Sequence, residues 1–452
     1  MNTPIADFVS GYARSDVSRL HMPGHKGRAV LGCESWDITE IAGADSLYEA
    51  DGIIARSEEN AAALFGSRHT FYATGGSSQC IRAMLHLVVT LRPEGTRPVI
   101  VAARNVHKSF VHAAALVGFE VVWLWPDAER TSLCACPVSA ETLAEVLDGL
   151  EAPPAAVYVT SPDYLGGLQD IEALAGVCHD RGTLLAVDNA HGAYLHFCEP
   201  ARHPLDLGAD ICCDSAHKTL PVLTGGAYLH IGHRLPKCFG ENARQALALF
   251  GSTSPSYLIM CSLDLCNAAL AGEYRQELEK TIGNIMRFCE KLTKRGWKIT
   301  HDEPLKVTVH ASLGGVTGQD AAERLRKGGL EVEYADEDDL VMMLSPGNDK
   351  ADLEKALDAI GTPEMQHVPR MPLPASAGKQ AMTIREALFS RTETIPVCEA
   401  LGRICAQPTV SCPPAIPIAV PGEIINEDSV RLFERYGVKR VDVVYEHLRQ
   451  QF

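Results

Sequence analysis

Between about residues 57 and 286, short apolar segments of strand length alternate with longer segments of helical periodicity. The segments of strand length are PVIVAA (98–103), AAVYVT (155–160), TLLAVD (183–188), ADICCD (209–214) and AYLHI (227–231). Helical stretches lie between them, for example at 77–91 and 170–182. Apolar strands separated by helices are typical of a mostly parallel sheet covered on both faces. The pattern therefore predicts an α/β domain.

The flanking segments predict further parts of the chain, and 452 residues are enough for two or three domains. The first 55 residues contain one short amphipathic helix followed by loops. After residue 290 the pattern changes to that of a smaller α+β domain, and a proline-rich joint follows at 367–379. We therefore predict an N-terminal arm, a large domain, a small domain and a C-terminal segment, at 1–55, 56–290, 291–366 and 367–452.

Composition narrows the class of partner. The chain has 41 Lys and Arg against 57 Asp and Glu, a net charge of −16, which argues against nucleic acid or an anionic membrane as the main partner. We find no signal peptide and no membrane span. The 15 cysteines have no metal-binding spacing, so we expect reduced thiols and a cytoplasmic location. Pro-Gly separates His21 from His25, so we expect no metal site there.

A turn rich in glycine and serine follows the strand-like segment TFYA. The stretch FYATGGSSQCIRAML passes into a helix through Thr74, Gly75, Gly76, Ser77 and Ser78. Glycines allow close approach of the backbone, and a helix N-terminus offers free N–H groups, so a phosphate fits there. Taken alone, an ordinary helix cap explains the stretch equally well.

Two charged residues follow this turn in the sequence. Asp188 closes an apolar strand, which is costly unless a cation meets it; a protonated heterocyclic nitrogen qualifies, as does an arginine or a helix N-terminus. Lys218 lies among small and apolar residues in DSAHKTLPVLTGGA, where an amine can act as a nucleophile toward an aldehyde. A phosphate turn, an acidic strand end and a lysine, in this order, describe a pyridoxal phosphate (PLP) site. In such a site Lys218 forms the Schiff base and Asp188 keeps the ring nitrogen protonated.

The chain resembles the Orn/Lys/Arg decarboxylases over nearly its whole length, in the short form of that family. The matching segments are LHMPGHKGR (20–28), DITEI (37–41), ATGGSSQ (73–79), RNVHKS (104–109), DNAHGA (188–193), DSAHKTLP (214–221), STSPSY (252–257), AMTIREALFS (381–390) and PPAIPIAVPGE (413–423). The resemblance implies a fold-type-I, aspartate-aminotransferase-like large domain with smaller α+β parts.

The resemblance also implies roles for individual residues. Lys218 is expected to carry PLP, and Asp188 to pair with its ring nitrogen. The remaining roles are contact with the phosphate for Ser77, Ser78, Ser215 and His217, stacking on the ring for His107, a place near the phenolic oxygen for His191, and contact with the neighbouring subunit's phosphate for Ser252. The implied assembly is a homodimer or higher homo-oligomer with shared active sites, whose entrance HMPGHK would line.

Two positions depart from the family pattern. The family commonly has Asp-Glu-Ala-His where this chain has Asn189 in place of the glutamate. It often has a glutamine in the stretch after the lysine, where this chain has Gly225. The second departure leaves open the substrate or subunit contacts at that point.

The predicted reaction is PLP-dependent decarboxylation of lysine, ornithine or arginine to the corresponding diamine or polyamine, the work of a carbon–carbon lyase. Another PLP reaction, such as transamination or racemisation, and a catalytically silent regulatory subunit are the alternatives. The sequence leaves open which amino acid is used, what binds its side-chain cation, what protonates Cα, and the physiological role. Outside the motifs, we expect DEDD (336–339) to be a solvated turn.

Overall fold

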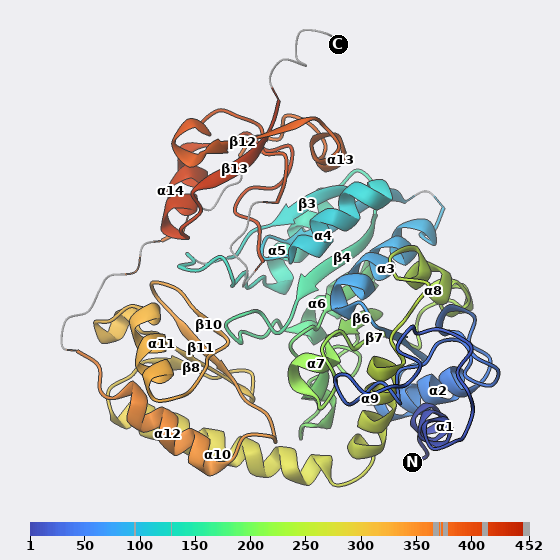
Figure 1. The fold of residues 1–452 in the computed structure, drawn as a ribbon. Helices are drawn as coiled ribbons and strands as arrows, with labels where there is room; N and C mark the ends of the chain where they lie inside the picture. The colour runs from blue at the N-terminus through green and yellow to red at the C-terminus, as the bar shows by residue number, and fades with distance from the viewer. Residues whose placement is uncertain are drawn as a thin grey trace. The chain divides into compact units, whose positions relative to one another are not determined.

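The computed structural model describes residues 1–94, 96–127, 129–364, 370, 372–373, 378–408 and 415–445. The chain forms two compact units, coloured along the sequence in Figure 1. The first unit contains 1–93, 171–180 and 184–281, and the second contains 94–170, 181–183 and 282–452.

The first unit contains four strands of the large sheet in the order β1-β7-β6-β5. These strands are β1 (His69–Ala73), β5 (Leu184–Asp188), β6 (Ile211–Asp214) and β7 (Ala227–Ile231). Strands β5 and β6 are parallel, and Asp188 is paired with Cys213, so both strands end at the same edge. Strand β7 is antiparallel to both β6 and β1.

Helices and short turns surround these strands. They are α1 (Pro4–Ala13), η1 (Leu47–Glu49), α2 (Ile53–Phe65), α3 (Gly76–Thr90), α6 (Ile171–Asp180), η3 (Ala193–Phe197), α7 (Ala216–Thr219), α8 (Lys237–Leu249) and α9 (Tyr257–Leu270), while α10 (Tyr274–Lys294) continues into the second unit. The predicted apolar face of α1 is confirmed at Ile5 and Val9, which are fully buried. The buried Asp264 accepts hydrogen bonds from the backbone N–H groups of Ile5 and Ala6, both at 2.9 Å, and so satisfies donors that a helix N-terminus leaves unpaired.

The second unit contains three further strands, in the order β4-β2-β3, and they are parallel to one another. The elements of this part are β2 (Arg97–Ala103), α4 (Lys108–Ala113), η2 (Ala114–Gly118), β3 (Glu120–Leu124), α5 (Ala140–Asp148) and β4 (Pro154–Thr160). The strands predicted from apolar runs are thus confirmed, and so is the α/β class with a mostly parallel sheet and smaller additional parts.

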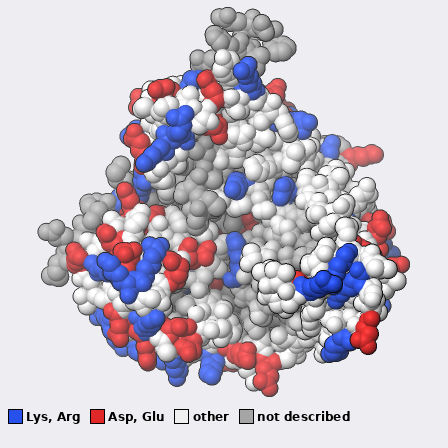
Figure 2. Space-filling view, in the orientation of Figure 1, with Lys and Arg blue, Asp and Glu red and all other residues white. Residues whose placement is uncertain are grey.

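A small antiparallel sheet follows in the second unit, in the order β10-β11-β9-β8. Its elements are β8 (Ile299–Thr300), β9 (Lys306–Val309), η4 (Ser312–Gly314), α11 (Gly318–Lys327), β10 (Tyr334–Ala335), β11 (Leu340–Met343) and α12 (Lys350–Ile360). Acidic and basic side chains are mixed over α11 and α12 on the face that Figure 2 shows, as expected of a solvated helical surface.

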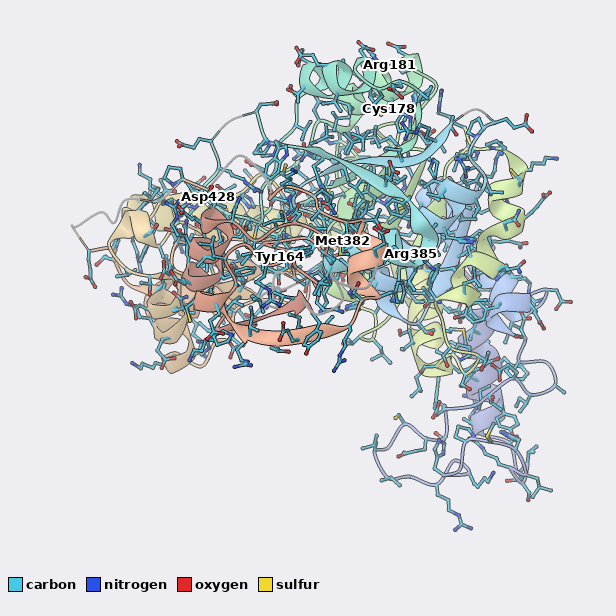
Figure 3. The ribbon with its side chains drawn as sticks, turned by 90° about the horizontal axis from the view of Figure 1, so that it is seen from above. Tyr164, Cys178, Arg181, Met382, Arg385 and Asp428 are labelled. Carbon is cyan, nitrogen blue, oxygen red and sulfur yellow. The ribbon has the colours of Figure 1, made fainter. Side chains whose placement is uncertain are left out.

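The last part of the second unit pairs β12 with β13 around a cluster of buried apolar residues. Its elements are α13 (Ile384–Leu388), β12 (Thr392–Pro396), η5 (Val397–Glu399), α14 (Glu427–Arg435) and β13 (Arg440–Val444). The TIREAL segment begins α13 because Thr383 and Glu386 form a reciprocal capping box. Arg385, labelled in Figure 3, donates from Nη1 to the carbonyl oxygen of Ala115 at 2.6 Å and so fastens α13 to η2.

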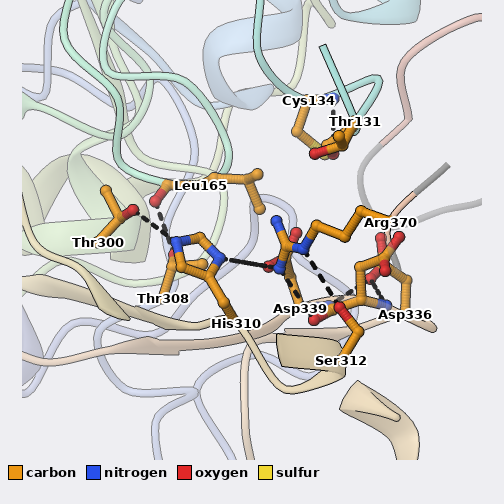
Figure 4. A network of polar contacts seen from close by, with 12 residues as sticks. Thr131, Cys134, Leu165, Thr300, Thr308, His310, Ser312, Asp336, Asp339 and Arg370 are labelled. Carbon is orange, nitrogen blue, oxygen red and sulfur yellow. Dashed lines mark hydrogen bonds and ion pairs between the residues drawn. The ribbon is translucent and has the colours of Figure 1, made fainter. Parts of the chain in front are cut away.

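The expectation of a solvated turn at DEDD is wrong. Asp339 is fully buried and Asp338 is only 7% exposed. The cause is a set of partners from distant segments: His310 contacts Asp339 at 2.7 Å, Arg370 forms an ion pair with Asp339, and Arg435 forms one with Asp338. Figure 4 shows the His310 imidazole, the Asp339 carboxylate and the Arg370 guanidinium in one network, with a direct contact between the imidazole and the guanidinium as well. Paired charges can be buried where unpaired ones cannot.

The predicted domain boundaries stay a prediction. Most of the proline-rich joint at 367–379 and the final residues 446–452 lie outside the described residues. Among the helices of the described part, none has the length and apolar character needed to cross a bilayer.

Candidate active site

The glycine-serine turn joins β1 to α3 in the first unit. Gly76 has a left-handed backbone, with φ of +68°, and its N–H donates to the carbonyl oxygen of Gly225 at 2.8 Å. Gly225 has φ of +101°, and a Cβ there would lie 2.9 Å from the carbonyl oxygen of Thr74. A side chain at Gly225 is therefore excluded by both backbone strain and contact. At this departure from the family pattern, the glycine allows two turns to approach each other.

Three predicted phosphate ligands gather near the start of α3. The Ser215 hydroxyl donates to the Ser77 hydroxyl at 2.9 Å, and both residues are buried. The His217 ring lies beside Gly76, and its Nδ1–H donates to the carbonyl oxygen of Gly226 at 3.1 Å. Burial, with a smaller contribution from nearby Lys218, lowers the pKa of His217. Among the described residues, no side chain caps the N-terminus of α3, and the Ser77 and Ser215 hydroxyls lie at this helix end.

Ser78, the fourth predicted phosphate ligand, lies next to Ser77 in the first turn of α3. Its carbonyl oxygen accepts a hydrogen bond from Arg82 Nε at 2.8 Å. This bond involves only the backbone of Ser78, and its hydroxyl is at the same helix end as that of Ser77.

The predicted lysine and acid lie at the ends of adjacent parallel strands. Asp188 ends β5, is 2% exposed, and accepts a hydrogen bond from Ala190 N–H at 3.1 Å. Lys218 is on the single turn of α7 that follows β6, and its Nζ is 2.9 Å from Nε2 of His191. His191 is itself buried, three residues after Asp188. The structure thus joins the predicted lysine to the loop that follows the predicted acid.

A buried carboxylate that sequence reasoning did not assign to the site lies directly before Ser215. Asp214 is fully buried and accepts from Nε2 of His203 and Nε2 of His230, both at 3.1 Å, and from Nδ2 of Asn189 at 2.6 Å. Burial acts to raise the pKa of Asp214, but the two imidazoles outweigh it, so that its pKa is well below the ordinary value. The signal in the sequence was an aspartate closing an apolar strand, as at Asp188.

The remaining predicted site residues are His107 and Ser252. His107 is in the second unit, where its Nδ1 accepts from Ser109 N–H at 3.2 Å and caps α4. Ser252 is exposed in the loop after α8, and its hydroxyl accepts from Ser254 N–H at 3.1 Å. No described hydrogen bond links Ser252 to Ser77 or Lys218.

The HMPGHK segment of the N-terminal arm places its two histidines against different partners. His21 Nε2 is 2.6 Å from the Tyr12 hydroxyl, and His25 Nε2 is 3.1 Å from Asp37. Each imidazole therefore has a local partner within the arm.

Two segments of the chain match models of a known protein family. Residues 3–312 match the major domain of the Orn/Lys/Arg decarboxylases, and residues 364–436 match their C-terminal domain. An arginine decarboxylase of Bacillus subtilis (strain 168) is 30% identical over 95% of this chain and 92% of its own length. The uncharacterized protein YaaO of the same organism is 32% identical over 96% of this chain and 94% of its own length.

Solved structures support the same fold. The lysine decarboxylase LdcF of Francisella novicida has a TM-score of 0.80 at 18% identity and covers 98% of this chain and 81% of its own. The constitutive lysine decarboxylase of E. coli has a TM-score of 0.76 at 17% identity and covers 98% and 82%. With both family domains matched in order, the chain belongs to the Orn/Lys/Arg decarboxylase family.

Proposed function

We propose that this protein removes the α-carboxylate of a basic amino acid as CO2 with Lys218 as the amine that carries PLP and Asp188 as the partner of the ring nitrogen. Membership of the family makes the protein a PLP-dependent amino-acid decarboxylase, a carbon–carbon lyase. The residue roles rest on one observation above all. The Lys218 amine contacts His191, in the loop directly after the buried Asp188, at the strand edge that carries Ser215.

The residues present fit the phosphate and the ring of PLP. The uncapped N-terminus of the 15-residue helix α3 provides N–H donors, and Ser77 and Ser215 add hydroxyls at the same turn. Asp188 is a buried carboxylate, and a protonated ring nitrogen is a cation that such a carboxylate stabilises. We propose that Ser78 and His217 complete the phosphate site and that His107 stacks on the ring.

In the proposed reaction, side chains of this chain would act together with PLP. When bound, PLP accepts the electron pair that the departing CO2 leaves behind. Asp188 holds a proton at the ring nitrogen, which keeps the ring electron-poor. The Lys218 Nζ lies 2.9 Å from His191 Nε2, so this imidazole nitrogen would be placed to take a proton from Nζ and leave that amine nucleophilic. Burial of Asp188 and His191 excludes water from this exchange.

Arginine is the substrate we propose first. Relatives that match nearly the whole chain, from Bacillus subtilis and Halalkalibacterium halodurans, bear the name arginine decarboxylase. In sequence, the relatives named lysine decarboxylase match a shorter part, for example 55% of this chain for the Pseudomonas aeruginosa protein, and so does the biodegradative arginine decarboxylase of Escherichia coli at 57%. Lysine and ornithine differ from arginine in side-chain length and head group, so all three must be compared directly.

We also propose a cytoplasmic homodimer in which Ser252 and the arm face the partner subunit. Several apolar side chains of the arm are highly exposed, among them Leu20 at 95%, Val30 at 82% and Leu31 at 87%. Adjacent exposed apolar residues are typical of surfaces that another chain covers. Every cysteine that the structure describes is a free thiol, which supports a reducing compartment.

The test is product identification together with a spectrum. Purified protein incubated with equal lysine, ornithine and arginine should release labelled CO2 and form agmatine in preference to cadaverine and putrescine. An absorbance band at the edge of the visible should disappear on borohydride treatment. The reduced cofactor should then be found covalently attached to Lys218.

Lys218→Ala should lower turnover by about three orders of magnitude or more. Lys237→Ala, at an exposed lysine on α8, is the matched control and should leave turnover unchanged. Full turnover by Lys218→Ala would refute the role of that lysine. Transfer of the amino group to a keto acid without CO2 release would refute the reaction.

A further inference from the structure

Asn189, where the family commonly has glutamate, is bonded to β6 at two points. Its side-chain Nδ2 donates to Asp214 Oδ1 at 2.6 Å, and its backbone N–H donates to the carbonyl oxygen of Cys213 at 3.0 Å. Asn189 and Asp214 are both fully buried. The departure at 189 therefore has a specific partner at the end of the neighbouring strand.

Asp214 is satisfied by hydrogen-bond donors. The Leu205 N–H donates to Nδ1 of His203, at 3.4 Å, so the ring hydrogen is on Nε2 and points to Asp214. His230 also presents Nε2 to Asp214, while its Nδ1 contacts the Thr70 hydroxyl at 2.8 Å. A metal ion would need an Nε2 of His203 free of hydrogen. The arrangement fits a buried anion held by two imidazole N–H groups and one amide.

This anion explains why an amide stands at 189. A carboxylate at that position would face the Asp214 oxygen at the 2.6 Å now spanned by the amide hydrogen bond. Two buried carboxylates at that distance repel each other strongly, so one must take up a proton or move away. In this arrangement the amide at 189 stabilises the Asp214 carboxylate, whereas a carboxylate placed where the amide now lies would destabilise it.

The pair also lies between two residues of the proposed PLP site. Asp188 directly precedes Asn189, and Ser215, whose hydroxyl donates to Ser77, directly follows Asp214. The hydrogen bond between Asn189 and Asp214 therefore links the residues that follow β5 to the end of β6. We propose that Asn189 and Asp214 are a positioning pair that fixes the Asp188 carboxylate and the Ser215 hydroxyl for PLP. This inference rests on the proposed function.

The test measures PLP binding and the protonation of the bound chromophore, with thermal unfolding of the PLP-free protein alongside. Asn189→Ala removes the hydrogen-bond donor to Asp214. Asn189→Asp replaces the amide with a carboxylate of nearly the same size, which then faces the Asp214 carboxylate. Losing a hydrogen bond to a charged group should weaken PLP binding about tenfold for Asn189→Ala, and more for Asn189→Asp. Both variants should shift the pH at which the absorbance band changes, because Asp188 is displaced from the ring nitrogen.

Exchange of the two residues provides a rescue. In the double variant Asn189→Asp with Asp214→Asn, an amide again faces a carboxylate, so PLP binding should recover most of what Asn189→Asp loses. A double variant no better than the worse single variant would overturn the proposal. So would Asn189→Ala with unchanged PLP affinity and an unchanged band.

The opposite end of β6 offers a matched control. Asp210 is 1% exposed and, like Asp214, contacts a histidine, His179 Nε2 at 3.1 Å, but it accepts from Leu185 N–H away from the site. Asp210→Asn should lower the unfolding temperature without changing PLP affinity or its spectrum. If it alters the spectrum as Asn189→Ala does, the pair has no special role. Wild-type protein without any PLP band would instead refute the proposed function, and the pair with it.

Discussion

Asp214 in the first unit and Asp339 in the second are both fully buried aspartates with a histidine within hydrogen-bond distance. Their other partners differ. Asp214 receives a second imidazole and the amide of Asn189, whereas Asp339 receives the Arg370 guanidinium. Asp214 is next to a proposed PLP ligand, and Asp339 is in a turn between β10 and β11.

The difference shows two ways of burying a carboxylate. An arginine cancels the charge of Asp339, so the contact acts as a structural link between the turn and the segment that carries Arg370. The donors to Asp214 are polar groups on neighbouring strands and loops, and they leave a negative charge in place next to the site. We therefore expect substitutions at Asp339 to change stability alone, and those at Asp214 to change stability and PLP binding together.

Asp339→Ala should have the largest effect on stability. It leaves the partly buried Arg370, whose side chain is 14% exposed, without its carboxylate, which typically costs about 3 kcal/mol in the free energy of unfolding. Denaturant unfolding measures the loss, and PLP affinity of the folded protein should stay unchanged. Glu337→Ala, at an exposed residue of the same turn, should change the free energy of unfolding by less than about 0.5 kcal/mol. If Asp339→Ala and wild type have the same free energy of unfolding, the contact between Asp339 and Arg370 does not stabilise the fold.

The same two regions show how far the sequence predicts the molecule. Strand β6 and the lysine after it were predictable, because an apolar run and the residues following it are local features of the chain. The partners of DEDD were not: Arg370 is 31 residues beyond Asp339, and Arg435 is 97 beyond Asp338. A cluster of acids has the same pattern in solvent as in a buried turn, and only the fold brings the arginines to it.

Asp214 lies between these extremes. Its position at a strand end was visible, but the donors on His203 and His230 arrive through a loop and an antiparallel strand that local patterns do not place. The departure at Asn189 was visible as well, and its reason became clear only from the contact with Asp214. Motif order predicted the lysine, the acid and the serines of the proposed site, and the contact with the neighbouring strand explains the departure at Asn189.

Arg435→Met should have a smaller effect than Asp339→Ala. It removes the cation from Asp338, whose side chain is 11% exposed and can still reach water, so a loss of about 1 to 2 kcal/mol is expected. Arg431→Met on the same helix is the control, because Arg431 is 65% exposed and its pair with Asp428 should contribute less than about 0.5 kcal/mol. Equal losses in the free energy of unfolding for the two variants would mean that the contact between Arg435 and Asp338 contributes no more than an exposed ion pair.

Acid titration provides the smallest and sharpest test of the comparison. Because the pKa of Asp214 is lowered in the folded protein, its ionised form contributes stability above the ordinary aspartate pKa of about 3.9, and this contribution is lost as pH falls further. The difference in free energy of unfolding between wild type and Asp214→Asn should therefore narrow by about 1 kcal/mol between pH 5 and pH 3. A difference that stays constant or widens on acidification would mean that Asp214 is not an anion held by its imidazoles. The contrast with the arginine-paired Asp339 would then lose its physical basis.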